Sequence, residues 1–259
     1  MKYYKITAII SILILIIAGF CFYIYQKPSN GLLILEYHKV NDIDNDEYTI
    51  PVKDFTAQLD YLSAEGYTTI SLMDFIHAKK YGEKLPAKPI ILTFDDGYED
   101  NFTNVAPIVN KHNMKATFFI IGNYINKKDY INWAQLKQLQ NDNIEIGCHT
   151  ANHLPLTTLS AAQIQNEVKL SKLLMEWNGL KTIFFFSYPN GMYNNTAIQA
   201  LQQNNYLAAV TGDPGLNTFS TNPYLLQRTY IPRERFSLLG LKLRILKSKL
   251  FYYFHINQH

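Results

Sequence analysis

The sequence is short of cysteine, arginine and glycine. Two cysteines occur among 259 residues, and Cys21 lies in an apolar stretch near the N-terminus, so a disulfide framework is not expected. Twelve glycines and ten prolines are too few for a collagen-like chain or a proline-rich linker protein. Hydrophobic residues make up 47% and charged residues 17%, a balance that excludes a disordered tail. The length allows one domain or two small ones.

Charge is distributed unevenly along the chain. Residues 1–27 carry three lysines and no acid, whereas residues 28–232 carry fifteen basic against twenty acidic residues. Residues 233–259 carry six basic residues and a single acid, Glu234. A nucleic-acid-binding protein usually has a basic body, so nucleic acid is excluded as a partner.

The N-terminal stretch 6–25 contains no charged side chain and is rich in isoleucine and leucine. About twenty such residues in a helix span the hydrocarbon core of a bilayer, which is about 30 Å thick. Lys2 and Lys5 precede the stretch, so an uncleaved anchor would leave residues 28–259 outside the cytoplasm, at a cell surface or in a periplasm. The alternative is a cleaved signal peptide and a secreted protein, although no small-residue cleavage site follows.

Short apolar runs alternate with helical patterns through the rest of the chain. Near-continuous apolar runs are typical of strands buried on both faces of a parallel sheet, and the alternation favours an α/β barrel or doubly wound sheet. The strands are expected at 32–37, 90–94, 116–121, 143–148, 182–187 and 206–211. The helices are expected at 53–66, 72–81, 101–112, 134–141, 159–177 and 194–204.

Polar clusters directly follow four of the predicted strands. They are Tyr37-His38, 93–97 (TFDDG), 149–153 (HTANH) and 187–191 (SYPNG). In a barrel of parallel strands, reactive residues gather at the carboxyl ends of the strands. These four clusters would therefore line one mouth and form a site.

Two of these clusters have the residue types of an open metal site. His149 and His153 can present both imidazoles to one ion, and a neighbouring aspartate completes a set of three ligands. Such a site leaves room for water, and the other carboxylate of the Asp95-Asp96 pair can act as its base. Taken singly, the aspartates could cap a helix and the histidines could be ordinary loop residues. Together they indicate a hydrolytic metal site.

The TFDDG and HTxxH motifs, in this order, resemble the polysaccharide deacetylase family of nodulation-type carbohydrate esterases. The resemblance covers about residues 31–232 and implies a distorted (β/α)7 barrel. It also implies that Asp95 is the catalytic base, and that Asp96, His149 and His153 hold a divalent metal. The metal is commonly zinc, with Co²⁺, Ni²⁺ or Fe²⁺ as alternatives.

Two departures from the family pattern point to a subgroup. The third motif lacks its usual arginine, and the histidine expected in the last motif is absent. Deacetylases of poly-β-1,6-N-acetylglucosamine, the intercellular-adhesin type, are similar in an early Tyr-His-x-Val, a Tyr-Pro-x-Gly and a late Leu-x-Arg. By this resemblance His38 is the general acid, and Arg228 pairs with Asp95. A structural histidine and a surface arginine are the alternatives.

Other positions along the chain carry further predictions. The backbone N–H of Asn190 is expected to help stabilise the oxyanion. Asp213 could orient His38, although a turn explains the Asp-Pro-Gly sequence equally well. The candidate substrate-binding residues are Tyr98, Trp133, Tyr188 and Pro189.

The C-terminal stretch 236–254 combines apolar residues at helical spacing with several lysines. It resembles a basic amphipathic helix suited to an anionic membrane, and the alternative is a last helix that covers the barrel. Three segments are thus expected: an anchor or signal at 1–27, a catalytic domain at 28–235 and a C-terminal helix at 236–259.

The resemblance implies a metal-dependent enzyme that removes N-acetyl groups from an extracellular N-acetylglucosamine polymer, with poly-β-1,6-N-acetylglucosamine expected first. Peptidoglycan, chitin-like oligomers and acetylated xylan are alternative substrates, and a non-catalytic carbohydrate-binding relic is the alternative to an enzyme. The expected partners are the polysaccharide, the membrane and an exopolysaccharide synthesis machinery.

Overall fold

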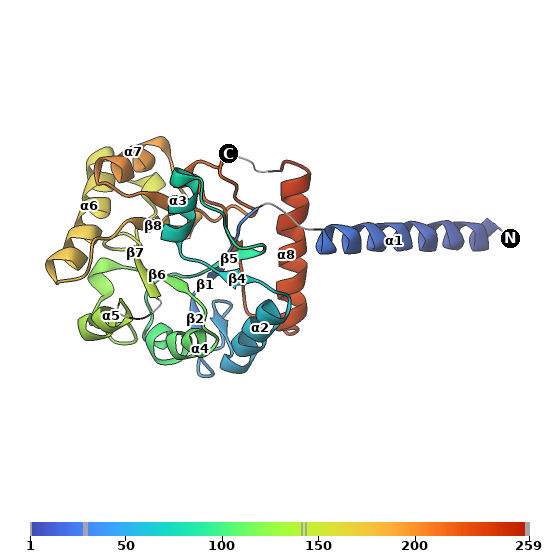
Figure 1. Ribbon diagram of the computed structural model, residues 1–259, viewed down its shortest axis with the longest axis horizontal. Helices are drawn as coiled ribbons and strands as arrows, with labels where there is room; N and C mark the ends of the chain where they lie inside the picture. Colours follow the sequence, from blue (N-terminus) through green and yellow to red (C-terminus); the bar gives the residue numbers. More distant parts are fainter. Residues whose placement is uncertain (1, 28–30, 141, 143, 257–259) are drawn as a thin grey trace.

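The fold is built around one curled parallel sheet. A computed structural model describes residues 2–27, 31–140, 142 and 144–256 (Figure 1). The strands run in the order β10-β1-β5-β6-β7-β8-β9, with β4 paired to β5, and every pairing in this sheet is parallel. A parallel bridge from Val210 to Leu226 links the far edge to the segment that leads into β10, so the two edges approach each other. The strands are β1 (Leu33–Tyr37), β4 (Thr68–Thr69), β5 (Pro89–Phe94), β6 (Ala116–Ile120), β7 (Ile144–Cys148), β8 (Phe185–Ser187), β9 (Ala208–Val210) and β10 (Thr229–Tyr230). A separate pair is formed by β2 (Lys39–Val40) and β3 (Thr49–Ile50).

Six helices cover the outer face of the sheet. They are α2 (Val52–Ala64), α4 (Ala106–Lys111), α5 (Trp133–Leu139), α6 (Ala161–Trp177), α7 (Asn195–Gln203) and α8 (Ser237–Tyr253), while α1 (Lys2–Gln26) and α3 (Leu72–Tyr81) lie elsewhere. Helix α3 shows why the local sequence fixes their bounds. Ser71 and Asp74 form a capping box at its start, and Gly82 ends it in the left-handed conformation at φ 72°.

The two faces of the sheet bury different sets of residues. One apolar cluster fills the space between the sheet and α2, α4, α5, α6, α7 and α8, and a second lies on the inner face, where α3 covers it. Because side chains alternate along a strand, the inner face continues from Ile34 to Glu36 on β1, and from Ile91 through Thr93 to Asp95 along β5. The inner face is therefore apolar at the amino ends of these strands and polar at their carboxyl ends.

Helix α1 projects from the body (Figure 1). Its stretch Ile9–Gln26 is long and apolar enough to cross a membrane, and almost all of it is exposed. The helix is compatible with a membrane anchor or with a signal sequence.

The expected α/β class and barrel-like parallel sheet are confirmed, with seven strands along the main path. The other expected elements agree with the structure to within two residues at each end, and two differ by more. The helix expected at 101–112 is a π-helical turn (Asn101–Val105) followed by α4, because Pro107 has no N–H to continue a regular helical ladder. The strand expected at 182–187 begins only at Phe185.

Candidate active site

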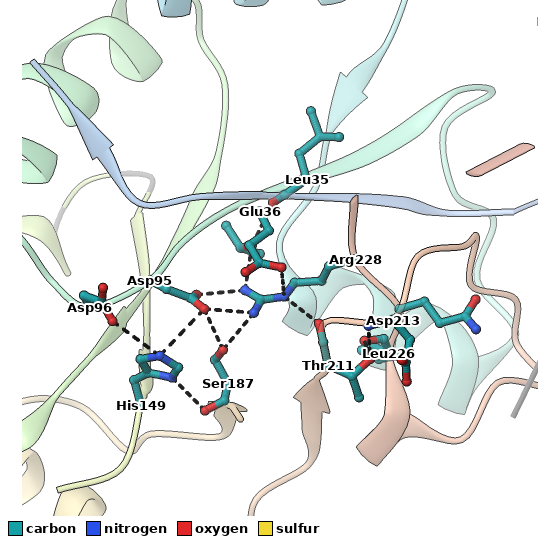
Figure 2. A network of polar contacts seen from close by, with 12 residues as sticks. Leu35, Glu36, Asp95, Asp96, His149, Ser187, Thr211, Asp213, Leu226 and Arg228 are labelled. Atoms are coloured by element: carbon teal, nitrogen blue, oxygen red, sulfur yellow. Dashed lines mark hydrogen bonds and ion pairs between the residues drawn. The ribbon is translucent and has the colours of Figure 1, made fainter. Parts of the chain in front are cut away.

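A buried ion pair forms the floor of the site (Figure 2). Arg228, which follows the bridge to β9, donates from both terminal nitrogens to the two oxygens of Asp95, each at 2.8 Å. Both side chains are almost fully buried. The Ser187 hydroxyl donates to Asp95 Oδ2 at 2.9 Å, and the Arg228 Nε donates to the Thr211 carbonyl at 2.9 Å. The carboxylate is thus fixed in position by two charge-assisted bonds and one hydroxyl.

The charges around this pair determine the protonation of Asp95. Burial alone would raise its pKa, but the Arg228 guanidinium and the nearby His149 together outweigh burial and hold the pKa well below its usual range. Glu36, on the neighbouring strand β1, lies 3.3 Å from the Arg228 Nε. Burial raises the pKa of Glu36 and Arg228 opposes that shift. Of the two carboxyl groups beside Arg228, Asp95 is therefore the one that stays ionised.

Asp96, His149 and His153 converge beside Asp95. The Nε2 atoms of the two imidazoles are 3.1 Å apart, and Asp96 Oδ1 lies 3.5 Å from His149 Nε2 and 3.3 Å from His153 Nε2. The Nδ1 atom of His149 lies 2.8 Å from the Ser187 carbonyl. That contact assigns the proton to Nδ1 and leaves Nε2 free to bind a cation.

These three donors fit a divalent metal. Two ligands bound at about 2.0–2.1 Å to a tetrahedral zinc ion lie about 3.3 Å apart, which matches the observed separations. Asp96 Oδ1 is buried and has no hydrogen-bond partner among the described residues. A buried acceptor without a partner is costly, and a cation at this point would satisfy it.

Strained turns aim these residues into the site. Asp96, His153 and Asn190 have φ values of 74°, 59° and 57°, in the left-handed region that residues other than glycine rarely adopt. In the turn Pro189–Gly191 the backbone comes close to a second loop, and a Cβ on Gly191 would lie 2.3 Å from the Gly212 nitrogen. Only glycine allows this approach.

His38 lines the same pocket as the three donors. Its ring packs 5.1 Å from that of Tyr48 and 5.8 Å from that of Tyr230. Its Nδ1 is buried without a hydrogen-bond partner in the described part of the chain. Ligand atoms of Glu36, His38 and Asp95 all lie within 4.8 Å of one another. The pocket has a volume of about 490 Å³ and is lined by Glu36, His38, Tyr48, Asp95, Asp96, Tyr98, His149, His153, Asn190, Gly191, Gly212 and Tyr230.

Some of the predicted site residues line the pocket, and others lie outside it. The pocket brings together both aspartates, all three histidines, Asn190 and Tyr98, and Arg228 lies beneath them. Trp133, at the start of α5, packs against the core and does not line the pocket. Tyr188 and Pro189 are buried and do not line the pocket, and the Tyr188 hydroxyl donates to the Tyr224 carbonyl. Asp213 accepts at 3.4 Å from the hydroxyl of Tyr193.

Sequence reasoning missed four residues of the site: Glu36, Tyr48, Ser187 and Tyr230. Glu36 had a signal, because an acid in the apolar run LLILEY must find a partner when the strand is buried. Tyr48 lies in a loop without a motif, and only the fold brings it to His38.

Comparisons with known proteins agree on one family. Residues 82–209 match the family model for polysaccharide deacetylases. YxkH of Bacillus subtilis, whose name assigns it to the polysaccharide deacetylases, is 32% identical over 206 residues, covering 80% of this chain and 73% of that protein. The poly-β-1,6-N-acetyl-D-glucosamine N-deacetylase of Staphylococcus epidermidis is 25% identical over 243 residues, covering 83% of each chain. The deacetylase PplD of Streptococcus pyogenes, solved in complex with acetate, gives a TM-score of 0.77 at 26% identity, covering 85% of this chain and 99% of that one.

The chain belongs to the polysaccharide deacetylase family. It is therefore a deacetylase enzyme, with a cluster of Asp and His that can hold a metal.

Proposed function

We propose that the protein is a metal-dependent N-deacetylase of poly-β-1,6-N-acetylglucosamine, with Asp96, His149 and His153 holding the divalent ion. The main support for this proposal is that these three donors lie in one pocket with His38 and with Asp95, which is paired with Arg228. Zinc is the first candidate, because two imidazoles and one carboxylate suit it.

Each residue has a proposed role in amide hydrolysis. Asp95 accepts a proton from the attacking water, while Arg228 and Ser187 hold its carboxylate in place. The Asn190 N–H donates to the oxyanion that develops on the acetyl carbonyl. His38 donates a proton to the leaving nitrogen, so that acetate and a free amine result.

The metal complements a weak base. The ion pair that keeps Asp95 ionised also lowers its proton affinity. When bound, a divalent ion acidifies water toward a pKa of about 7 and polarises a carbonyl, which compensates for the weak base.

The substrate and location rest on different observations. The curated relative from Staphylococcus epidermidis acts on poly-β-1,6-N-acetyl-D-glucosamine by its name, and its match runs through 83% of both chains. The apolar helix α1 supports a membrane anchor with the catalytic domain outside the cytoplasm. An exopolysaccharide synthesis machinery would then be a partner at the same surface.

Acetate release from the purified full-length protein tests this proposal. Poly-β-1,6-N-acetylglucosamine and peptidoglycan are compared as substrates, with Asp95→Asn as the site variant and Asp60→Asn as a control at an exposed carboxylate on α2. The proposal predicts release from the first polymer that Asp95→Asn abolishes and Asp60→Asn preserves. Acetate release from peptidoglycan alone would refute the proposed substrate. Equal rates in the two variants would refute the proposed role of Asp95.

A further inference from the structure

Helix α8 exposes an apolar stripe on the side opposite its packing face. Gly240, Leu241, Ile245 and Ser248 face the body and are buried. Four large apolar residues at spacings of three, four and eleven point outward, with exposed fractions of 65% (Phe236), 53% (Leu239), 55% (Leu243) and 58% (Phe254). Leu246 and Leu250 continue the same stripe and are half-buried. A surface helix normally presents polar residues there, so this stripe indicates a partner.

Basic residues flank the stripe. The helix contains Lys242, Arg244, Lys247 and Lys249 and no acidic residue. Lys242 lies over the ring of Tyr61 at 4.5 Å, and Arg244 pairs with Glu234, while Lys247 is exposed. A second copy packed on this stripe about a two-fold axis would bring like charges together. An anionic surface would complement them.

The apolar helix α1 meets α8 at the C-terminal end of α8. The rings of Phe20 and Phe254 are 6.2 Å apart, and Lys249 Nζ donates to the Tyr25 carbonyl at 2.6 Å. Figure 1 shows α1 leaving the body crosswise to α8, on the outer side of α8. A bilayer crossed by α1 would therefore lie against the outward side of α8.

We propose that the outward stripe of α8 lies in the interface of an anionic lipid membrane, parallel to its plane. The proposal rests on the insertion of α1 put forward above, but not on the proposed substrate. The end of α1 and Lys249 share a pocket with Leu33 and Pro89, the first residues of β1 and β5. The catalytic residues follow the opposite ends of these strands. Contact at α8 fixes the rotation of the body about α1, and so the direction in which the catalytic pocket faces.

Fluorescence of a label on α8 tests the contact in the full-length chain. In a Cys21→Ser background, where the remaining Cys148 is buried, an environment-sensitive dye is attached at Leu243→Cys. Lys169→Cys is the control, because it is exposed on α6, on the far side of the body (Figure 1). Leu15→Cys reports whether α1 inserts. The protein is reconstituted into vesicles of phosphatidylcholine with or without phosphatidylglycerol, and nitroxide-labelled lipids serve as quenchers.

We expect lipid quenching at residue 243 to exceed that at residue 169 at least threefold in anionic vesicles, and to fall in high salt. In a Leu239→Glu/Leu250→Glu variant, quenching at residue 243 should fall to the control level, while acetate release from a short soluble oligomer stays unchanged. Water-like emission at residue 243 overturns the proposal, whatever residue 15 shows. Emission that shifts with the protein-to-lipid ratio, without lipid quenching, also overturns it and assigns the stripe to a second copy. Quenching without deacetylation would contradict the proposed function alone.

Discussion

Replacing Arg228 tests whether the buried ion pair organises the site. The variant Arg228→Met keeps much of the side-chain volume and removes the cation. Asp95 would lose two charge-assisted bonds of 2.8 Å, and Glu36 would lose its cation at 3.3 Å. Breaking a buried pair by removing one partner costs about 3–5 kcal/mol, because an uncompensated buried charge remains.

Urea unfolding of the full-length chain in detergent, followed by the fluorescence of Trp133 and Trp177, measures this cost. Bound metal is first removed with a chelator, because an ion bound to the native state would add stability. The double variant Asp95→Asn/Arg228→Met should recover about 2 kcal/mol or more, since the orphaned charge at residue 95 is gone. A loss below about 1 kcal/mol in Arg228→Met, the size typical of an exposed pair, would show that the buried ion pair does not stabilise the site.

Three further predictions follow from other parts of the molecule. Glu36→Ala should lower kcat roughly tenfold in steady-state assays and leave KM unchanged, because Arg228 Nε loses the carboxyl oxygen that lies 3.3 Å away and then positions Asp95 less firmly; an unchanged kcat would contradict this. Gly191→Ala should cost about 1–3 kcal/mol in urea unfolding, because φ is 68° and the new Cβ would collide with the Gly212 backbone; an unaltered midpoint would exclude such strain. Burial raises the pKa of Glu145 from its ordinary value of 4.5 to about 7, so the native state binds this proton more tightly than the unfolded chain. The free energy of unfolding should fall as the pH rises from 4.5 to 7, and Glu145→Gln should make this pH dependence shallower than in the wild-type chain. The same pH dependence in both chains would contradict the raised pKa of Glu145.

The long elements could be predicted because each carries its own local signals. Helix α3 matches its expected bounds of 72–81, since Ser71 and Gly82 supply a start and a stop within the sequence. Strands β4 and β10 could not be predicted, because two residues are too few for a periodic pattern and their positions depend on β5 and β1.

In the site, too, some residues could be predicted from local motifs and others could not. The motif residues of the predicted metal and base cluster meet in the pocket because each follows a strand of the same parallel sheet. The position of Tyr188 could not be read from its motif, because the direction of its ring depends on the turn at Asn190 and on a partner 36 residues away, Tyr224. Tyr48 reaches His38 only through the packing of a loop that has no periodic pattern.

Titration of zinc into chelator-treated protein tests whether Asp96, His149 and His153 form the metal site on which activity depends. Bound zinc per chain and acetate release from poly-β-1,6-N-acetylglucosamine are measured on the same samples, with His153→Ala as the site variant and His112→Ala as a matched control outside the pocket. We expect activity to rise with zinc occupancy and to reach its plateau at one ion per chain. We also expect His153→Ala to lose zinc binding and activity, and His112→Ala to keep both. Full activity in the metal-free protein, or unchanged zinc binding in His153→Ala, would contradict these expectations.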